Sequence, residues 1–253
     1  MIRILAIGNS FSQDATHYLH QIALADNVEM KVANLYIGGC SLERHWQNVV
    51  TGAADYLYEL NGRSQERYVS VKEALEEDTW DVIVTQQASH DSGWMETYEP
   101  FLGNMVDYIR RQCPAARIYL NKTWAYEVDS THEKFARYHN DQKEMFARLS
   151  AAYQAASERR GIPLIPCGDV IQAIRREAPF RYEAGGMSLC RDGFHMSWLY
   201  GRYALAAAWY ATITGRAMTE NSYIPETSMT EERADERLII RIRGIVDSVT
   251  ANI

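Results

Sequence analysis

Short apolar runs alternate with helical patterns along most of this chain. The interiors of the runs are apolar and rich in β-branched residues, as in parallel strands that are buried on both faces. The runs lie at residues 2–7, 30–36, 81–85, 117–121 and 163–166. Because strands and helical segments alternate, we predict an α/β fold: a three-layer α/β/α sandwich around a five-stranded parallel sheet.

Segments with helical patterns lie between and after these runs. They cover residues 14–25, 98–112, 133–160, 199–214 and 228–249. Gly161 follows the third segment, as a glycine commonly follows the last residue of a helix. Ser228 and Glu231 form a capping-box pattern at the start of the last segment. Residues 52–67 and 179–191 are less regular, and we expect a decoration between two strands and a loop that lines the substrate pocket.

Length and composition suit one large α/β domain. The chain has 253 residues, of which 47% are hydrophobic and 23% charged, and it contains no internal repeat or low-complexity linker. We therefore expect a single domain over residues 1–253. A net charge of -7 without a Lys/Arg-rich block argues against a nucleic-acid partner. No apolar stretch reaches the roughly 20 residues that are needed to span a bilayer.

The start of the chain bears on its location. The first predicted strand begins at Ile2, which leaves no room for a signal peptide before it. This favours the cytoplasm. Removal of a leader segment would instead indicate a periplasmic or secreted protein.

Four cysteines, Cys40, Cys113, Cys167 and Cys190, are widely scattered. No CxxC pair and no Cys/His cluster with metal-ligand spacing accompanies them, so we expect neither a metal nor an organic cofactor. We interpret them as small, buried side chains and leave a disulfide open. Cys40 has no base near it in the sequence, which argues against a cysteine nucleophile.

Ser10 follows the first apolar run, in Gly8-Asn9-Ser10-Phe11-Ser12. A serine between a parallel strand and its helix lies at the carboxyl edge of the sheet, where open α/β folds bind their ligands. The hydroxyl needs a base before it can act as a nucleophile. On this motif alone, a helix-start or turn serine is the alternative, because serine favours such positions.

Asp192 and His195 supply the groups that Ser10 needs. Their spacing of three lets one short turn present both side chains to the same side. Asp192 would then accept a hydrogen bond from one ring nitrogen of His195 and leave the other nitrogen free as the base. The alternative is an N-cap aspartate with an incidental histidine.

Two middle segments fit the same pocket. Gly38 and Gly39 follow the second strand, and a glycine there can bring a backbone N–H close to a substrate oxygen; a plain tight turn is the alternative. Gln86 follows the third strand, and its side-chain amide can donate to an oxyanion.

These segments resemble the four blocks of the SGNH (GDSL-like) hydrolase superfamily. Gly8-Asn9-Ser10 matches the nucleophile block, with Asn9 where the commonest form has Asp, and Asp192-Gly193-Phe194-His195 matches the D-x-x-H block. The chain as a whole most resembles a bacterial branch of the DUF4886 type. The resemblance implies the flavodoxin-like strand order 2-1-3-4-5, a triad of Ser10, His195 and Asp192, and an oxyanion hole that includes the N–H groups of Ser10 and Gly39.

The third block departs from the usual Gly-x-Asn-Asp form. It reads Gln86-Gln87-Ala88-Ser89 and is closer to the Gln-Gly-Glu form of carbohydrate-acetylesterase and sialate-acetylesterase branches. We therefore expect Gln86 to be the side-chain oxyanion donor, with Ser89 or Gln87 as alternatives. The resemblance implies a serine esterase that hydrolyses an acyl ester, in the first place an acetyl ester on a carbohydrate.

Two other functions stay open. One is a non-catalytic module that binds a carbohydrate or another ligand on the same fold, and the other is a thioesterase or lipase. Ser89, Trp124 and Tyr126 are candidate substrate-binding residues. For the two aromatic residues, we favour a wall of the core over an exposed platform for a sugar ring.

Overall fold

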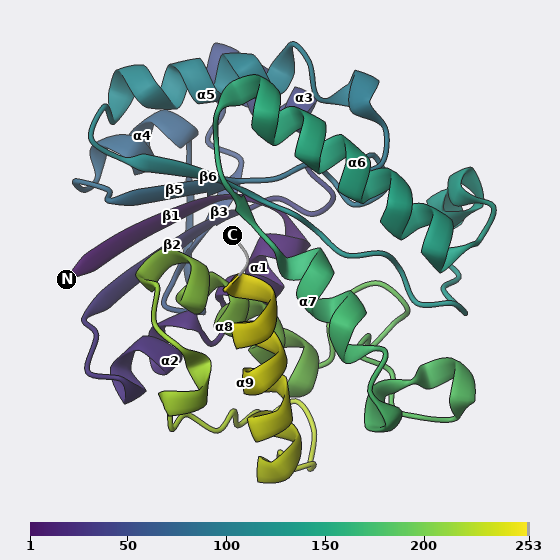
Figure 1. Ribbon diagram of the computed structural model, residues 1–253. Helices are drawn as coiled ribbons and strands as arrows, with labels where there is room; N and C mark the ends of the chain where they lie inside the picture. The colour runs from purple at the N-terminus through teal and green to yellow at the C-terminus, as the bar shows by residue number, and fades with distance from the viewer. Residues whose placement is uncertain (252–253) are drawn as a thin grey trace.

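The computed structural model describes residues 1–251 and contains a mixed sheet of seven strands with helices on both faces (Figure 1). The strands are β1 (Ile2–Gly8), β2 (Met30–Tyr36), β3 (Tyr56–Leu60), β4 (Arg63–Val69), β5 (Val82–Thr85), β6 (Arg117–Asn121) and β7 (Leu164–Ile165). Their order across the sheet is β4-β3-β2-β1-β5-β6-β7. The strands β2, β1, β5, β6 and β7 pair in parallel, in this order across the sheet, whereas β3 pairs antiparallel with both β2 and β4.

The prediction of a sheet with only five parallel strands is wrong. The five strands expected from the apolar runs are present in the expected order, β2-β1-β5-β6-β7. The segment expected to be irregular, residues 52–67, adds most of the hairpin β3-β4 beside β2. Asn61 and Gly62 form its turn with φ of 51° and 78°. An Asn-Gly pair with both φ values positive is typical of a tight hairpin turn, so the sequence did contain the signal.

Helices cover both faces of the sheet (Figure 1). One face carries α3 (Leu42–Thr51), α4 (Val71–Glu76), α5 (Phe101–Gln112) and α6 (Gln142–Arg160). The other carries α1 (Ser10–Thr16), α2 (Leu19–Ala25), α7 (Cys167–Ile174), α8 (Tyr200–Thr214) and α9 (Glu236–Thr250). Short 3₁₀ helices are η1 (Met95–Thr97), η2 (Glu133–Tyr138), η3 (Ala178–Phe180), η4 (Tyr182–Ala184) and η5 (Met218–Glu220).

Several helix boundaries differ from the expected ones. The segment expected as one helix over 133–160 is divided, because His139 and Asn140 have positive φ and Asp141 caps a new helix, α6. The last helix begins at Glu236, so Ser228 does not cap it. Asp235 does, and its side chain accepts the N–H of Arg237.

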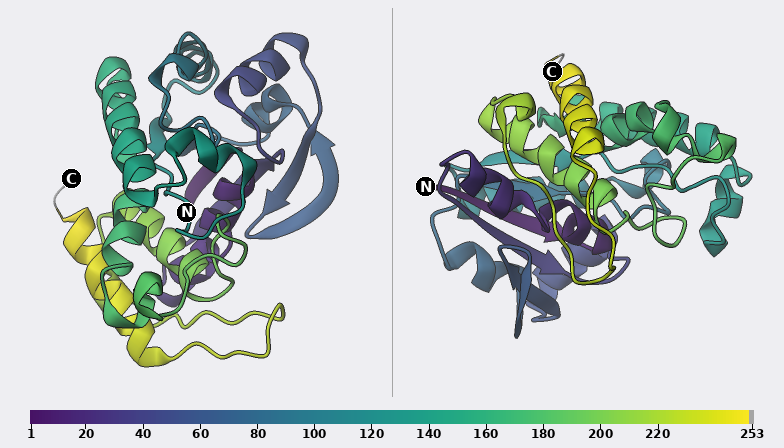
Figure 2. Two further views of the ribbon diagram at one scale, coloured as in Figure 1. Left: turned by 90° about the vertical axis from the view of Figure 1, so that its right-hand side faces the viewer. Right: turned by 90° about the horizontal axis from the view of Figure 1, so that it is seen from below.

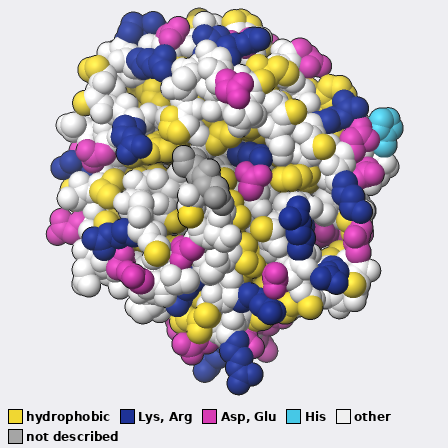
Figure 3. Space-filling view, viewed as in Figure 1, with side chains coloured by type: hydrophobic (Ala, Val, Ile, Leu, Met, Phe, Trp, Pro, Cys, Tyr) yellow, Lys and Arg dark blue, Asp and Glu magenta, His cyan; other side chains and the backbone are white. Residues whose placement is uncertain are grey.

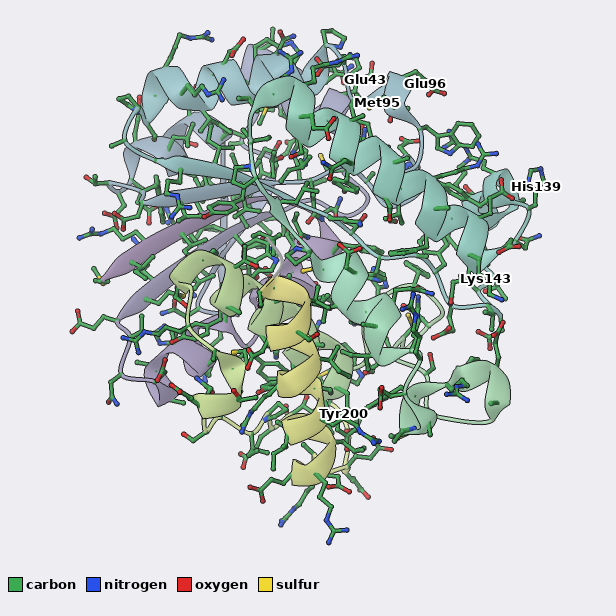
Figure 4. The ribbon with its side chains drawn as sticks, in the orientation of Figure 1. Glu43, Met95, Glu96, His139, Lys143 and Tyr200 are labelled. Atoms are coloured by element: carbon green, nitrogen blue, oxygen red, sulfur yellow. The ribbon has the colours of Figure 1, made fainter. Side chains whose placement is uncertain are left out.

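The central helix α8 is buried along most of its length and links the sheet to α9. Tyr200, its first residue, lies near the start of α9 (Figure 4). The Tyr200 hydroxyl accepts the backbone N–H of Asp235 at 2.9 Å. Gly215, with φ of 70°, ends α8 as expected.

The carboxyl ends of the parallel strands lie on one edge of the sheet, and this edge is turned toward the viewer in the left panel of Figure 2. Loops and the start of α1 gather at this edge (Figure 2). On the face seen in Figure 3, acidic and basic side chains are interspersed. Within residues 1–251, every helix is too short or too polar to traverse a bilayer.

Candidate active site

Ser10 is the first residue of α1 and follows the end of β1 by two positions. Asn9 is the N-cap: its backbone is extended, and its side-chain oxygen accepts the N–H of Phe11 at 3.0 Å. A Cβ atom on Gly8 would lie 2.4 Å from the hydroxyl oxygen of Ser12, so only glycine lets the helix turn back this closely onto the strand. Gly8 and Asn9 therefore place Ser10 at the carboxyl edge of the sheet.

Asp192 and His195 lie together on the loop before α8. The Asp192 Oδ2 atom is 2.7 Å from Nδ1 of His195, and Asp192 Oδ1 accepts the backbone N–H of His195 at 2.8 Å. Burial raises the pKa of Asp192, but the hydrogen bonds from the ring and backbone of His195 outweigh it and hold the pKa below its ordinary value. The carboxylate is therefore charged at neutral pH and orients the ring, as the spacing of three predicts.

The loop that carries this pair is folded as a narrow hairpin. Cys190 and Met196 form an antiparallel bridge, and Arg191 donates its backbone N–H to the carbonyl of His195 at 2.9 Å. Gly193 occupies the tip with φ of 85°, which a residue with a side chain rarely adopts. The short loop thus fixes the turn in which Asp192 and His195 meet.

Phe11, the residue after Ser10, contacts His195. The Phe11 ring meets the His195 ring edge-on, with the two centroids 6.0 Å apart. Within residues 1–251, no hydrogen bond joins the Ser10 hydroxyl to His195. The ring contact places the start of α1 beside the histidine, and the hydrogen bond between Ser10 and His195 stays a prediction.

Gly39 lies on the exposed loop after β2, with φ of 62°. The loop is tied to the start of α1, because the Asn9 side-chain amide donates to the carbonyl of Cys40 at 3.0 Å. Among the described residues, the backbone N–H groups of Ser10 and Gly39 make no hydrogen bond. Both are therefore available as donors to a ligand at this edge.

The structure contradicts the expectation that Gln86 faces the substrate. Gln86 is 0% exposed and belongs to a chain of buried side chains. Trp209 donates to Asn121 at 3.1 Å, Asn121 donates to Gln86 at 2.7 Å, and Gln86 donates to Asn9 at 2.8 Å. Asn9 in turn donates to Cys40. Gln86 thus holds the orientation of Asn9 from beneath, out of reach of a ligand that arrives from solvent.

Ser89 differs from the two glutamines of the third block. Gln87 is also 0% exposed, and its side chain bonds to the backbone N–H of Leu42 and Ala88 and to Thr97. Ser89 is partly exposed, and its hydroxyl lies 2.8 Å from the hydroxyl of Tyr126. Of the three candidate residues, Ser89 alone is partly exposed.

Trp124 and Tyr126 are both 0% exposed, so neither forms a sugar platform on the surface. Trp124 stacks on Phe11 with 4.0 Å between ring centroids and donates its ring N–H to the carbonyl of Phe194 at 2.8 Å. Tyr126 lies beneath Ser89 and packs against Phe194. These aromatic residues pack beneath the start of α1 and the His195 loop. They form a wall of the core, as favoured above for Trp124 and Tyr126.

Cys40 and His45 form a buried Cys/His pair that was not expected from the sequence. The Cys40 Sγ atom lies 3.4 Å from Nδ1 of His45, and both residues are 0% exposed. Burial raises the pKa of the Cys40 thiol to about 12 and lowers the pKa of His45 to about 3. The thiol is therefore neutral and inaccessible, as suits a packing residue.

All four cysteines are free, and no group of three or more His, Cys, Asp or Glu side chains within residues 1–251 is arranged to hold a metal ion.

The roles of Asn9 and Asn121 in the hydrogen-bond network of the site were not expected. Asn9 was noted only as a departure from Asp, yet its amide group joins the cap of α1, the Gly39 loop and Gln86. Asn121 ends the apolar strand β6 and is 0% exposed. A polar residue at the carboxyl end of a buried strand was the available signal, since buried amides need partners.

A family model described as "Domain of unknown function (DUF4886)" matches residues 3–237. A search of curated proteins found no match. The crystal structure of a DUF4886 family protein from Bacteroides uniformis is 34% identical, with a TM-score of 0.90 over 99% of this chain and 95% of that chain.

More distant solved structures share the fold. A candidate SGNH hydrolase from Slackia heliotrinireducens is 22% identical, with a TM-score of 0.56 over 84% of this chain and 98% of that chain. An acetylxylan esterase from Geobacillus stearothermophilus is 12% identical, with a TM-score of 0.55 over 89% of this chain and 97% of that chain. The fold of this chain is thus one that these two solved structures share.

Proposed function

The chain belongs to the DUF4886 family, and we propose that it is a serine esterase in which Ser10 is the nucleophile, His195 the base and Asp192 the group that orients it. The observation that carries the proposal is the 2.7 Å contact between Asp192 Oδ2 and His195 Nδ1, on the loop beside the start of α1. A carboxylate that binds one ring nitrogen keeps the other nitrogen as a proton acceptor.

The proposed reaction is acyl transfer in two steps. His195 takes the hydroxyl proton of Ser10 as the oxygen attacks the ester carbonyl, and the resulting imidazolium is stabilised by Asp192. Collapse of the tetrahedral intermediate breaks the ester C–O bond, and His195 returns the proton to the leaving alcohol. Water then attacks the acyl-enzyme with His195 again as the base, which releases the acid and restores Ser10.

The oxyanion would be held by the backbone N–H groups of Ser10 and Gly39. Neither N–H has a partner within residues 1–251, and the Asn9 bridge to Cys40 holds the two loops together. We propose Ser89 rather than Gln86 as the third-block side chain that faces the substrate. Its partial exposure supports this choice, and Tyr126 is placed to hold the Ser89 hydroxyl in position.

We propose an acetyl ester on a carbohydrate as the substrate class. The shared fold with an acetylxylan esterase supports it at the level of architecture. A small acyl group also fits the packing next to Ser10, because the rings of Phe11, the next residue, and Trp124 are stacked and buried.

The proposal is tested with purified protein on a panel of esters. We expect hydrolysis of p-nitrophenyl acetate and of acetylated xylo-oligosaccharides, and much slower hydrolysis of a palmitoyl ester and an acyl thioester. The Ser10→Ala variant should lose at least 10³-fold in kcat. Ser64→Ala, on the remote strand β4, is the matched control and should keep full activity. Equal activity of Ser10→Ala and the natural protein would exclude the assignment.

A further inference from the structure

Asp14 is a fully buried carboxylate in the helix that begins with Ser10. It lies four residues after Ser10, so the two residues share one face of α1. Its Oδ1 atom accepts Nε of Arg202 at 2.7 Å, and both of its oxygens lie within 3.1 Å of Nη1 of Arg191. Its Oδ2 atom also accepts the backbone N–H of Met196 at 2.9 Å.

The partners of Asp14 flank the Asp192–His195 turn on both sides. Arg191 directly precedes Asp192, and Met196 directly follows His195. The Arg191 guanidinium also donates to the carbonyl of Met196, so both backbone polar groups of Met196 are held by this cluster. One buried carboxylate on α1 therefore fastens the two ends of the turn that carries the base.

The two guanidinium groups of the cluster pack against one aromatic ring. The Trp198 ring faces the guanidinium groups of both Arg191 and Arg202, at 4.2 Å and 4.4 Å from the ring centroid. Arg202 is 6% exposed and belongs to α8, so the clamp joins α1, the loop and α8. A guanidinium has its donors in a fixed fork, which leaves little freedom for the carboxylate that it binds.

We propose that Asp14 is a positioning residue that sets the distance between the Ser10 hydroxyl and the His195 ring. The inference rests on the proposed esterase function. In nucleophilic catalysis, a displacement of about 1 Å between reacting groups lowers the rate by about 10²-fold. Asp14 does not reach the substrate, and it acts by tying the helix of the nucleophile to the loop of the base.

The test compares Asp14→Asn with a control that weakens a different ion pair. Asparagine keeps the shape of the side chain but loses the charge and one acceptor, so the two guanidiniums no longer hold it firmly. We expect kcat for p-nitrophenyl acetate to fall about 10- to 100-fold while KM changes less than about twofold. The rate at which a fluorophosphonate modifies Ser10 should fall by a similar factor.

Glu99→Gln is the control variant. It removes the negative charge that pairs with Arg160 on α6, where Glu99 Oε1 lies 2.7 Å from Nε, away from α1 and from the loop of His195. It should lower the melting temperature without changing kcat. All rates are measured well below the melting temperature of each variant, so that a merely structural loss leaves kcat unchanged.

Each outcome decides the inference. A folded Asp14→Asn variant with the kcat and labelling rate of the natural protein overturns it. If that variant does not fold, Arg191→Gln is measured instead. It removes the ion pair between Asp14 and the loop of His195, and Asp14 keeps Arg202 as its partner in the core. A lower kcat of Arg191→Gln supports the inference, and an unchanged kcat overturns it. A natural protein without Ser10-dependent turnover instead overturns the proposed function, which separates the two failures.

Discussion

The Asp192 carboxylate holds His195 at two points: Oδ2 lies 2.7 Å from Nδ1 of the ring, and Oδ1 accepts the backbone N–H at 2.8 Å. This double contact fixes both the ring and the residue that carries it. The tautomer of His195 then has its proton on the nitrogen that faces Asp192, which leaves the other nitrogen as the base.

Asp192→Asn should therefore lower kcat by about 10³- to 10⁴-fold with a small change in KM, because the amide favours the wrong tautomer and no longer stabilises the imidazolium. Steady-state kinetics on p-nitrophenyl acetate provide the measurement. Asp129→Asn is the control, since Asp129 contacts Tyr182 and not His195. A kcat within tenfold of the natural value would show that Asp192 has no part in catalysis.

Asn9→Asp should destabilise the protein, although it restores the commonest form of the nucleophile block. The Asn9 amide N–H donates to the Cys40 carbonyl. A carboxylate at position 9 has no donor, so one of its oxygens would face the Cys40 carbonyl oxygen and repel it. We expect a loss of about 1–3 kcal/mol in the free energy of unfolding at pH 7. The loss should shrink as the pH falls toward about 4, where a protonated carboxyl regains a donor. Urea denaturation at both pH values measures it, and equal stability at pH 7 contradicts the account.

The Asp192–His195 contact and the parallel strands were predictable from the sequence, whereas the partners of the buried polar side chains were not. Asp192 and His195 are three residues apart, so one turn brings them together whatever the rest of the chain does. The parallel strands were likewise predictable, because burial on both faces leaves an apolar run in each.

The burial and the partners of Gln86 could not be predicted from the sequence. A polar side chain after a strand was expected to face solvent, but its partners Asn9 and Asn121 are 77 and 35 residues away. Only the folded sheet brings β1, β5 and β6 side by side and lets a buried amide find both partners. The cluster of Asp14, Arg191 and Arg202 was missed for the same reason, since its members are up to 188 residues apart.

Gln86→Leu and Ser89→Ala should affect different quantities. Removal of the Gln86 amide leaves Asn9 and Asn121 without one partner each, so we expect the free energy of unfolding to fall by about 2–4 kcal/mol. Ser89→Ala removes the hydroxyl of a partly exposed residue, and we expect kcat to fall about 10²- to 10³-fold with stability nearly unchanged. Denaturation curves and kinetics on both variants test the contrast. A large loss of stability in Ser89→Ala, with unchanged kcat, would show that Ser89 supports the fold and does not take part in catalysis.

His45 should make the fold sensitive to acid. Burial lowers its pKa to about 3, whereas the unfolded chain has the ordinary value of about 6.5. The stabilising effect is complete above pH 6.5 and is lost as the pH falls toward 3, because only the unfolded chain binds the proton in that window. The slope is about 1.4 kcal/mol per pH unit, so lowering the pH from 6 to 4 costs up to about 3 kcal/mol.

The His45→Gln variant isolates this effect. Its free energy of unfolding should depend less steeply on pH between 4 and 6, by about one bound proton. Urea titrations at several pH values compare the two proteins. Parallel pH profiles for the variant and the natural protein would mean that His45 is not the group responsible.

Covalent labelling of Ser10 tests the central claim most directly. A fluorophosphonate reacts with a serine that a base has activated and leaves an unactivated serine unmodified. Intact-mass and peptide mass spectrometry should show one adduct on Ser10 in the natural protein, and none in Ser10→Ala. His195→Ala should slow the labelling by at least about 10³-fold. An unlabelled natural protein, or an adduct on another residue that persists in Ser10→Ala, would contradict the account.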